Sequence, residues 1–284
     1  MTGVPGGAGV VCARGMNFEN LPLARRTARL ALVPAAALIA LTACQDSGDP
    51  AGGATTSVAG SDAREDGEKG DTKPQRLLWM GDSVSEAQVP AVGAAMEAAG
   101  VEFESMASTG GGGVVGEIAE PTWKALPKTL ETFRPDVVAY QITTYDWGTP
   151  DEQRAAYTRL AEAVADAGAE LLLVSAPPFE VDDFYKPHEA EIKAAPGSAK
   201  TVADGRSDSV RFLDSTSLWG TDSGAAMAQR SKDGIHSCQQ GSAAFAQWFG
   251  KELHKLYGFA PAQAEKWATG SWTGEKVFSQ LGCA

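Results

Sequence analysis

Short apolar runs alternate with segments of helical periodicity from residue 76 to residue 257. Five runs have the length of strands: Arg76–Met80, Val101–Met106, Asp136–Ile142, Glu170–Ser175 and Val210–Asp214. Helical spacing predicts helices at about Ser85–Ala99, Trp123–Phe133, Asp151–Ala167, Glu189–Ala203 and Ser242–Tyr257. Because strands and helices alternate, we expect a parallel five-stranded sheet covered on both faces, that is, a three-layer α/β/α domain over residues 76–258.

The last predicted helix carries large apolar side chains on one face: Phe245, Trp248, Phe249, Leu253 and Leu256. This spacing indicates a face that is buried in the core. Residues 259–284 follow with two tryptophans and a cysteine. We therefore expect a C-terminal extension that folds back onto the domain.

A different pattern precedes the domain. Arg25, Arg26 and Arg29 are followed by an apolar run that ends in Leu41-Thr42-Ala43-Cys44. The run is too short for a permanent membrane span but suits the core of a signal peptide. Its last residues resemble a bacterial lipobox, which implies that residues 1–44 are a lipoprotein signal peptide and that Cys44 receives the lipid. An ordinary secretory signal that ends near a cysteine is the alternative.

Residues 45–75 are rich in Gly, Ala, Ser, Thr and Asp and have almost no large apolar side chains. Such a segment cannot bury enough surface to offset chain entropy, so we predict a disordered linker. Signal and linker together predict an extracytoplasmic protein. We expect a monomer that is anchored to the cell membrane through its lipid alone.

Charge and cysteine content narrow the possible partners. The chain has 24 Lys and Arg against 36 Asp and Glu, a formal net charge of -12, which argues against a nucleic-acid partner because phosphates are repelled.

Outside the signal region, the cysteines that remain are Cys238 and Cys283. In an exported domain these two predict a disulfide, with two unpaired thiols as the alternative. No residue cluster suggests a metal site, and neither a metal nor an organic cofactor is expected.

Two distant segments carry residues suited to nucleophilic catalysis. Ser83 follows Gly81 where the first strand meets the first helix, and unpaired helix N–H groups there stabilise negative charge. The alternative role of Ser83 is an ordinary helix N-cap. Asp233 and His236 lie in a loop before the last helix, at a spacing that lets a turn aim the carboxylate at the imidazole. Ser83 is thus the candidate nucleophile, His236 the base and Asp233 the group that orients it, while Asp82 is expected to anchor the turn.

In this order the motifs resemble those of the SGNH, or GDSL-type, hydrolases over about residues 76–257. Gly81-Asp82-Ser83-Val84-Ser85 looks like the nucleophile block, Gly110 like the glycine whose N–H joins the oxyanion hole, and Asp233 with His236 like the last block. The resemblance implies a flavodoxin-like SGNH hydrolase fold with these blocks at the carboxyl edge of the sheet. It also implies an acyl-serine intermediate whose oxyanion is held by the N–H groups of Ser83 and Gly110.

The third block departs from the family pattern. The family usually shows Gly-x-Asn-Asp, with the Asn donating to the oxyanion, whereas this chain has Thr143-Thr144-Tyr145-Asp146. Tyr145 stands in the place of the third donor, and its hydroxyl or that of a nearby threonine is the candidate substitute. Losing one donor costs about a hundred- to a thousandfold in rate. The departure, followed by Trp147, is also similar to SGNH domains fused to bacterial membrane acyltransferases.

Three functions are therefore open. The first is a serine esterase that hydrolyses acetyl or short-chain acyl esters, with an acylated glycan among the possible substrates. The second is an O-acyltransferase that acts on envelope glycans, suggested by the third block. The third is a non-catalytic glycan-binding lipoprotein, suggested by Tyr145 in the place of Asn. Hydrolase and transferase share their catalytic residues and differ in how well the site excludes water.

Other polar and aromatic side chains have less defined roles. Trp147, Trp219 and Tyr185 are candidates for lining a sugar-binding cleft, with a packing role as the alternative. His188 and His254 are expected to be solvated residues without a part in the site.

Overall fold

The sheet is built around β3 (Val137–Gln141), a strand whose five residues are all buried. β1 (Arg76–Met80) and β4 (Glu170–Val174) pair with it on either side, while β2 (Glu102–Ser105) pairs with β1 and β5 (Val210–Leu213) with β4. All pairs are parallel, and the order is β2-β1-β3-β4-β5. This is the flavodoxin-like order, so the predicted five-stranded parallel sheet is confirmed.

The computed structural model describes residues 73–224 and 229–283, and all of them belong to one unit of the chain, residues 64–284. The predicted signal peptide (1–44), its lipidation site Cys44 and the linker as far as residue 72 lie outside the described residues. Within the described part, no helix combines the length and the apolar character needed to cross a bilayer.

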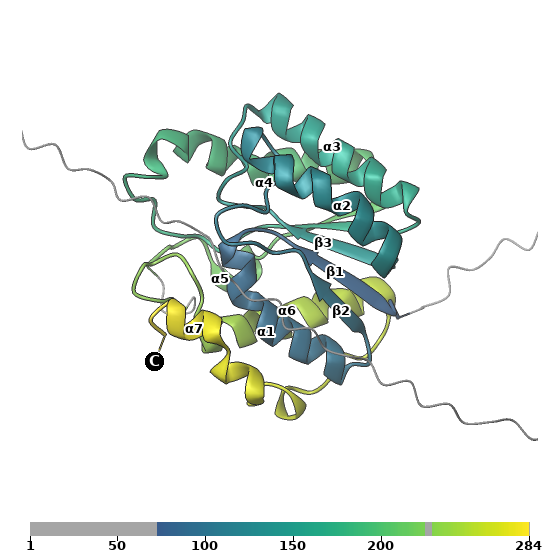
Figure 1. Cartoon of the computed structure of the whole chain (residues 1–284), viewed down its shortest axis with the longest axis vertical. Helices are drawn as coiled ribbons and strands as arrows, with labels where there is room; N and C mark the ends of the chain where they lie inside the picture. Colours follow the sequence, from purple (N-terminus) through teal and green to yellow (C-terminus); the bar gives the residue numbers. More distant parts are fainter. Residues whose placement is uncertain (1–72, 225–228, 284) are drawn as a thin grey trace, which may run out of the picture. The chain divides into compact units, whose positions relative to one another are not determined.

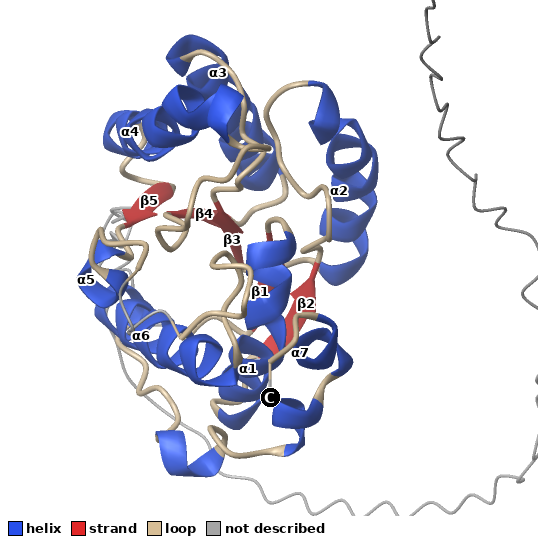
Figure 2. Ribbon diagram, turned by 90° about the vertical axis from the view of Figure 1, so that its left-hand side faces the viewer, coloured by secondary structure: helices blue, strands red, loops and turns tan. Residues whose placement is uncertain are grey.

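Helices cover both faces of the sheet and complete the predicted three layers (Figures 1 and 2). One face is covered by α2 (Glu120–Phe133), α3 (Pro150–Asp166) and α4 (Glu189–Gly205). The other is covered by α1 (Ser83–Ala98), α5 (Thr216–Trp219), α6 (Gln239–Tyr257) and α7 (Lys276–Gln280). Short 3₁₀ helices lie in the connecting segments and in the C-terminal extension of the described part: η1 (Glu117–Ala119), η2 (Lys186–His188), η4 (Ala264–Lys266) and η5 (Ser271–Gly274).

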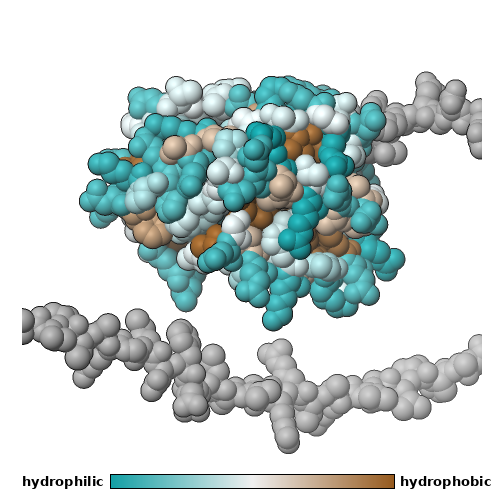
Figure 3. Space-filling model, turned by 90° about the horizontal axis from the view of Figure 1, so that it is seen from above, coloured by the Kyte–Doolittle hydropathy of each residue, from teal (hydrophilic) through white to brown (hydrophobic). Residues whose placement is uncertain are grey.

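The helices are amphipathic, and their outer surface is polar. In α2, Leu126 and Leu130 are buried against the sheet, whereas Lys128 and Glu131 form an exposed ion pair. Figure 3 shows the α2–α4 side of the domain as mostly hydrophilic, with small separate apolar patches. Burial of one helix face thus supplies the core on this side.

Each face of the sheet has its own apolar core, because strand side chains point alternately to the two faces. Leu78 packs among α2, α3 and α4, whereas Trp79 packs among α1 and α6. Trp79 meets Phe245 and Phe249 edge-on, with ring centroids 5.6 and 5.4 Å apart. Trp219 stacks on Phe245 and is 1% exposed. Trp219 is therefore a core residue, so its packing role is confirmed and a place in a sugar-binding cleft is excluded.

Strand positions agree closely with the predicted ones, whereas several helix starts differ. α1 begins at Ser83 rather than near Ser85, because Asp82 is the N-cap and its carboxylate accepts the Val84 N–H. α2 begins at Glu120, with a proline in its first turn, rather than at Trp123. α6 likewise begins at Gln239, directly after Cys238.

The C-terminal extension packs on the α1–α6 face, as predicted. Trp267 and Trp272 are buried in the core of that face, and the Trp272 indole N–H donates to the Trp267 carbonyl. Cys238 and Cys283 form a disulfide with their Cα atoms 5.6 Å apart and a sequence separation of 45. The predicted pairing is confirmed, and in the chain-entropy model such a loop stabilises by about 3–4 kcal/mol.

Candidate active site

The segments that carry the predicted catalytic residues meet at the carboxyl edge of the sheet, where ligand sites of open α/β folds lie. The serine turn, residues 81–85, follows β1, and the glycine run, residues 110–113, follows β2. Thr143 to Asp146 follow β3, and the histidine loop, residues 229–238, precedes α6. The strand order therefore brings together segments that are far apart in the sequence.

Ser83, His236 and Asp233 form a continuous hydrogen-bonded chain. His236 Nε2 lies 2.7 Å from Ser83 Oγ, and His236 Nδ1 lies 2.7 Å from Asp233 Oδ2. The other carboxylate oxygen of Asp233 accepts the N–H groups of Ile235 (2.8 Å) and His236 (3.0 Å). The predicted convergence of these three residues is confirmed. The arrangement has the geometry in which an imidazole takes the proton of a serine hydroxyl.

The environment keeps the Asp233 carboxylate ionised. Partial burial alone raises its pKa, but the Ser231 hydroxyl, the Ile235 N–H and the side chain and N–H of His236 outweigh burial and lower the pKa to about 2. At neutral pH the group is therefore an anion beside the imidazole. An anion there fixes the ring orientation and stabilises an imidazolium.

Close packing at Gly81 and the hydrogen bonds of the buried Asp82 carboxyl hold the serine turn in place. Gly81 has φ +152°, and a Cβ at this position meets Ser85 Oγ at 1.9 Å, so only glycine fits. Asp82 is 1% exposed; its Oδ1 accepts the Val84 N–H, and its Oδ2 accepts both the N–H and the hydroxyl of Thr144 at 2.7 Å. The predicted anchoring role of Asp82 is confirmed. Burial raises the pKa of this carboxyl, and the hydrogen bonds from Thr144, Val84 and Ser85 oppose that rise.

Ser83 itself is the first residue of α1 rather than its N-cap, so the N-cap alternative is wrong. Within the described ranges its backbone N–H has no hydrogen-bond partner. A free N–H at a helix N-terminus, next to the Ser83 hydroxyl, is suited to stabilising an oxyanion that forms on a carbonyl attacked by that hydroxyl.

The glycine run packs against the serine turn, but through Gly112 rather than Gly110. Gly112 has φ +78°, and a Cβ there meets the Gly81 carbonyl oxygen at 1.8 Å. Gly110 is exposed and has open space beside it. In the described part of the chain neither glycine N–H has a hydrogen-bond partner. The oxyanion role of Gly110 stays a prediction, and four consecutive glycines gave no signal as to which of them touches the turn.

Asp146 is a structural centre that sequence reasoning missed. It is 1% exposed and accepts hydrogen bonds from the hydroxyls of Tyr140 (2.7 Å), Tyr157 (2.9 Å) and Thr143 (2.9 Å), and from the Val114 N–H (3.3 Å). Its carboxyl thereby ties the end of the glycine run to β3. Burial raises the pKa of Asp146 against the effect of these donors. The available signal was an acidic residue in the segment that follows a wholly buried strand, five positions after Gln141.

Tyr145, which occupies the Asn position of the third block, belongs to an aromatic cluster. Its ring lies 5.4 Å from Trp147, 6.4 Å from Phe184 and 6.1 Å from Tyr185. Burial raises its pKa, and a hydrogen bond to Tyr185 raises it further. No contact between Tyr145 and Ser83 is found among the described residues, so its role as an oxyanion donor stays a prediction.

The two remaining histidines have no contact with the predicted catalytic residues, in agreement with the expectation, and His254 is exposed while His188 is half-buried. The His188 ring stacks on Trp147 with centroids 3.8 Å apart, and its Nδ1 lies 2.6 Å from the Glu191 carboxylate. His254 Nδ1 lies 2.7 Å from the Phe259 carbonyl oxygen and links α6 to the C-terminal extension. Neither ring is in contact with Ser83. Across the described ranges, no three His, Cys, Asp or Glu side chains are grouped as metal ligands.

Comparison with known proteins relates the chain to others by structure alone. No protein-family model matches the sequence, and no curated protein matches it either. A candidate acylhydrolase from Bacteroides fragilis NCTC 9343 is similar in structure, with TM-score 0.51 and 14% identity over 67% of this chain and 91% of the other. A GDSL-like lipase from Bacteroides thetaiotaomicron VPI-5482 has TM-score 0.51 and 15% identity over 64% and 89%.

A third solved structure agrees with these two. LAE5, an alpha/beta hydrolase from the metagenome of Lake Arreo, Spain, has TM-score 0.50 and 16% identity over 64% of this chain and 96% of its own. At such identities the likeness shows the fold. The chain thus has the three-layer α/β fold of SGNH and GDSL-type hydrolases.

Proposed function

We propose that this chain is a serine hydrolase that cleaves carboxylic esters through an acyl-serine intermediate. The observation that carries the proposal is the chain of two 2.7 Å contacts from Asp233 through His236 to Ser83. The fold supports the proposal independently, because the contacts lie at the sheet edge where α/β enzymes bind ligands.

In the proposed mechanism, Ser83 Oγ attacks the ester carbonyl while His236 Nε2 takes the hydroxyl proton. Asp233 stabilises the resulting imidazolium, and its lowered pKa keeps it anionic throughout. The oxyanion is held by the N–H groups of Ser83 and the glycine run, with Gly110 as the predicted donor. His236 then gives its proton to the departing alcohol, and a water activated by the same imidazole releases the acid.

Hydrolysis is favoured over acyl transfer by the exposure of the site. The Asp233 side chain is 37% exposed and the His236 side chain 15%, so water reaches the relay. Transfer to a sugar hydroxyl requires that water be excluded. The intact relay also counts against a non-catalytic glycan-binding role, because such a role places no demand on a serine–imidazole contact.

Hydrolysis of p-nitrophenyl acetate by the purified domain tests the proposal. We expect turnover that Ser83→Ala abolishes, with a kcat loss of about 10⁴-fold or more. Thr109→Ala, a change in the exposed loop beside the glycine run, is the matched hydroxyl deletion and retains activity. Activity that survives in Ser83→Ala contradicts the mechanism. Acylated glycan formed in place of free acetate, with a glycan acceptor present, supports the transferase.

We also propose that the protein is exported and anchored through a lipid on Cys44. The Cys238–Cys283 disulfide supports this proposal, because disulfides persist in oxidising compartments. Metabolic labelling with a palmitate analogue tests it in the source cell. Label is expected in the full chain and absent from Cys44→Ala, whereas equal labelling of both chains contradicts the anchor.

A further inference from the structure

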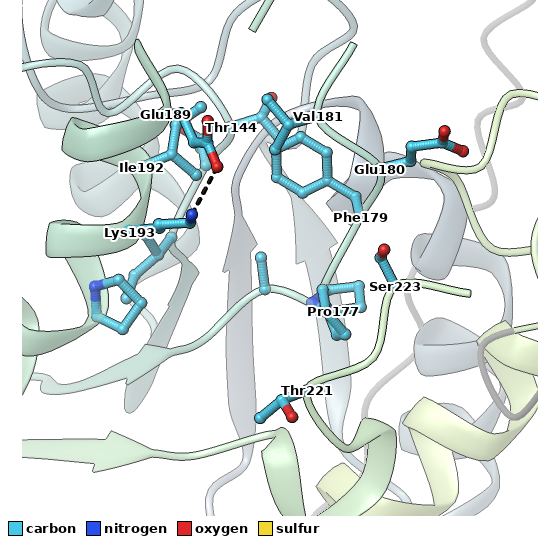
Figure 4. A pocket seen from close by; sticks show the side chains of 15 residues that line it. Thr144, Pro177, Phe179, Glu180, Val181, Glu189, Ile192, Lys193, Thr221 and Ser223 are labelled. Atoms are coloured by element: carbon cyan, nitrogen blue, oxygen red, sulfur yellow. Dashed lines mark hydrogen bonds and ion pairs between the residues drawn. The ribbon is translucent and has the colours of Figure 1, made fainter. Parts of the chain in front are cut away.

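A hollow of about 480 Å³ lies beside the proposed catalytic residues. Its walls come from the segment after β4, from α4 and from the segment before the histidine loop (Figure 4). Ile192 and Lys193 of α4 lie on one side, Phe179 and Val181 lie above, and Thr221 lies below (Figure 4). Pockets of this size hold small organic ligands.

The hollow shares its wall with both catalytic segments. Ser83 and His236 do not line it, but their chain neighbours Val84 and Ile235 belong to one apolar cluster with Phe179, Val181 and Ile192 of the hollow's wall. The wall also touches the histidine loop directly, because the Glu180 N–H donates to the Gly234 carbonyl (3.3 Å). A substrate chain that extends from the reacting carbonyl in this direction therefore enters the hollow.

The lining is suited to an uncharged apolar group. Besides Phe179, Val181 and Ile192 it includes Pro177 and Pro178. The lysine at its rim is neutralised, since Lys193 forms an ion pair with Glu189 on the same helix. The carboxyl group of Glu180, which also belongs to the wall, points away from the hollow (Figure 4). Thr143 and Thr144 supply the hydroxyls nearest to the serine turn, and Thr144 already donates its hydroxyl to Asp82.

We propose that this hollow binds a linear apolar chain of the ester substrate, on its acyl or its alcohol side, so that the enzyme prefers esters with a chain of medium length to esters that are short on both sides. The inference rests on the proposed function, and it departs from the expected acetyl or short-chain substrate by adding a longer chain. An acetyl group leaves most of the hollow unfilled, whereas a hexanoyl chain buries several methylene groups against its walls. Each methylene buried raises kcat/KM by about threefold to fourfold.

Two ester series test the proposal with the same enzyme. One varies the acyl chain, from p-nitrophenyl acetate to the butyrate, hexanoate and octanoate; the other varies the alcohol, from ethyl to butyl to hexyl acetate. We expect kcat/KM to rise up to about a hundredfold across one of the series. A rise in the first series means that the hollow takes the acyl chain, and a rise in the second that it takes the alcohol. Flat dependence in both overturns the proposal while leaving the esterase function intact.

Substitutions in the hollow locate the effect. Thr221→Trp places a large side chain at an exposed position of the wall, and we expect it to lower kcat/KM for the hexanoate by about tenfold or more with little change for the acetate. Ile192→Trp fills the hollow from α4 and is expected to act alike. Ala190→Trp, an exposed change on α4 outside the hollow, is the matched control and leaves both rates unchanged. Equal losses for both esters contradict the inference.

A binding measurement separates this inference from the proposed function. Calorimetric titration of Ser83→Ala with ethyl hexanoate and with hexyl acetate needs no turnover, and we expect that at least one of the two esters binds and that Thr221→Trp weakens this binding. If the wild type hydrolyses no ester but this binding is seen, the esterase proposal fails and the hollow stands. If neither ester binds, the hollow assignment fails whatever the catalytic result.

Discussion

Ser83 and His236 meet at 2.7 Å, yet the serine turn and the histidine loop are held by different means. The serine turn joins a buried strand to a long helix, and a carboxylate that is 1% exposed fastens it to the segment after β3. The histidine loop contains no strand or helix within its described residues beyond a single bridge between Arg230 and Ser237. Its orienting carboxylate, on Asp233, is 37% exposed.

Hydrogen bonds and a disulfide, rather than a strand or helix of its own, hold the histidine loop. The Arg230 guanidinium donates to the carbonyls of Ser223 (2.6 Å) and Gly234 (3.2 Å). The disulfide then fastens Cys238 to the end of the chain, two positions after His236. The comparison teaches that the position of the nucleophile is part of the global stability of the fold. The position of the base rests on constraints that can open without global unfolding.

The largest expected effect is on the orientation of the base. Asp233→Asn keeps the shape of the side chain but removes the anion, and we expect kcat to fall by about 10⁴-fold. Thermal stability changes little, because the Asp233 side chain is exposed and adds no contact to the core. Kinetics and a melting curve of the same sample measure both effects. A kcat within tenfold of wild type shows that Asp233 does not orient the imidazole.

The disulfide gives the next largest effect. Replacing Cys238 and Cys283 together by serine is expected to lower the free energy of unfolding by about 3–4 kcal/mol. Hydrogen exchange under native conditions then shows where the protection is lost. We expect faster exchange in residues 229–238 with the serine turn unchanged. Equal loss in both segments contradicts the separate support that we infer for them.

A change in the serine turn is expected to lower the stability of the whole domain rather than to loosen one loop. Gly81→Ala forces a Cβ onto Ser85 and a strained backbone, so we expect a loss of about 2–3 kcal/mol in the free energy of unfolding. Gly168→Ala is the matched control, because Gly168 also has a positive φ of 78° but has open space around it. Its expected cost is about 1 kcal/mol. Equal losses mean that backbone strain, rather than close packing, determines the turn.

The smallest effect is a pH dependence of stability that arises in the histidine loop. The pKa of Asp233 is lowered to about 2 in the folded chain from an ordinary 3.8. A lowered pKa stabilises the fold above pH 4, and this contribution is lost as the pH falls through 4 towards 2. Since the group is well exposed, we expect about 1 kcal/mol or less. Unfolding curves of wild type and Asp233→Asn diverge above pH 4 and converge near pH 2; a constant difference contradicts the assignment.

The strands, the catalytic convergence and the disulfide could all be predicted from the sequence. Apolar runs such as Asp136–Ile142 identify buried strands, and parallel strands bring their carboxyl ends to one edge. The resemblance of the motifs to those of SGNH hydrolases then implied that Ser83 and His236 lie near each other. The disulfide followed from two cysteines in a domain that was expected to be exported.

Features that depend on packing could not be predicted. Whether Gly110 or Gly112 touches the serine turn depends on the path of a loop, and consecutive glycines carry no side-chain pattern. The burial of Trp219 depends on α5, a helix too short to show periodicity. The hydrogen bonds of Asp146 join residues from β3, from α3 and from the end of the segment that carries the glycine run, where Val114 follows the glycines, and no local pattern encodes a contact among three segments.

The central claim is that the imidazole of His236 activates the hydroxyl of Ser83. It is tested most directly by the rate at which a fluorophosphonate probe labels the protein, with peptide mass spectrometry to locate the adduct. The account predicts a single adduct on Ser83 and a labelling rate that falls by about 10³-fold or more in His236→Ala. Absence of an adduct on Ser83, or equal labelling rates with and without His236, contradicts it.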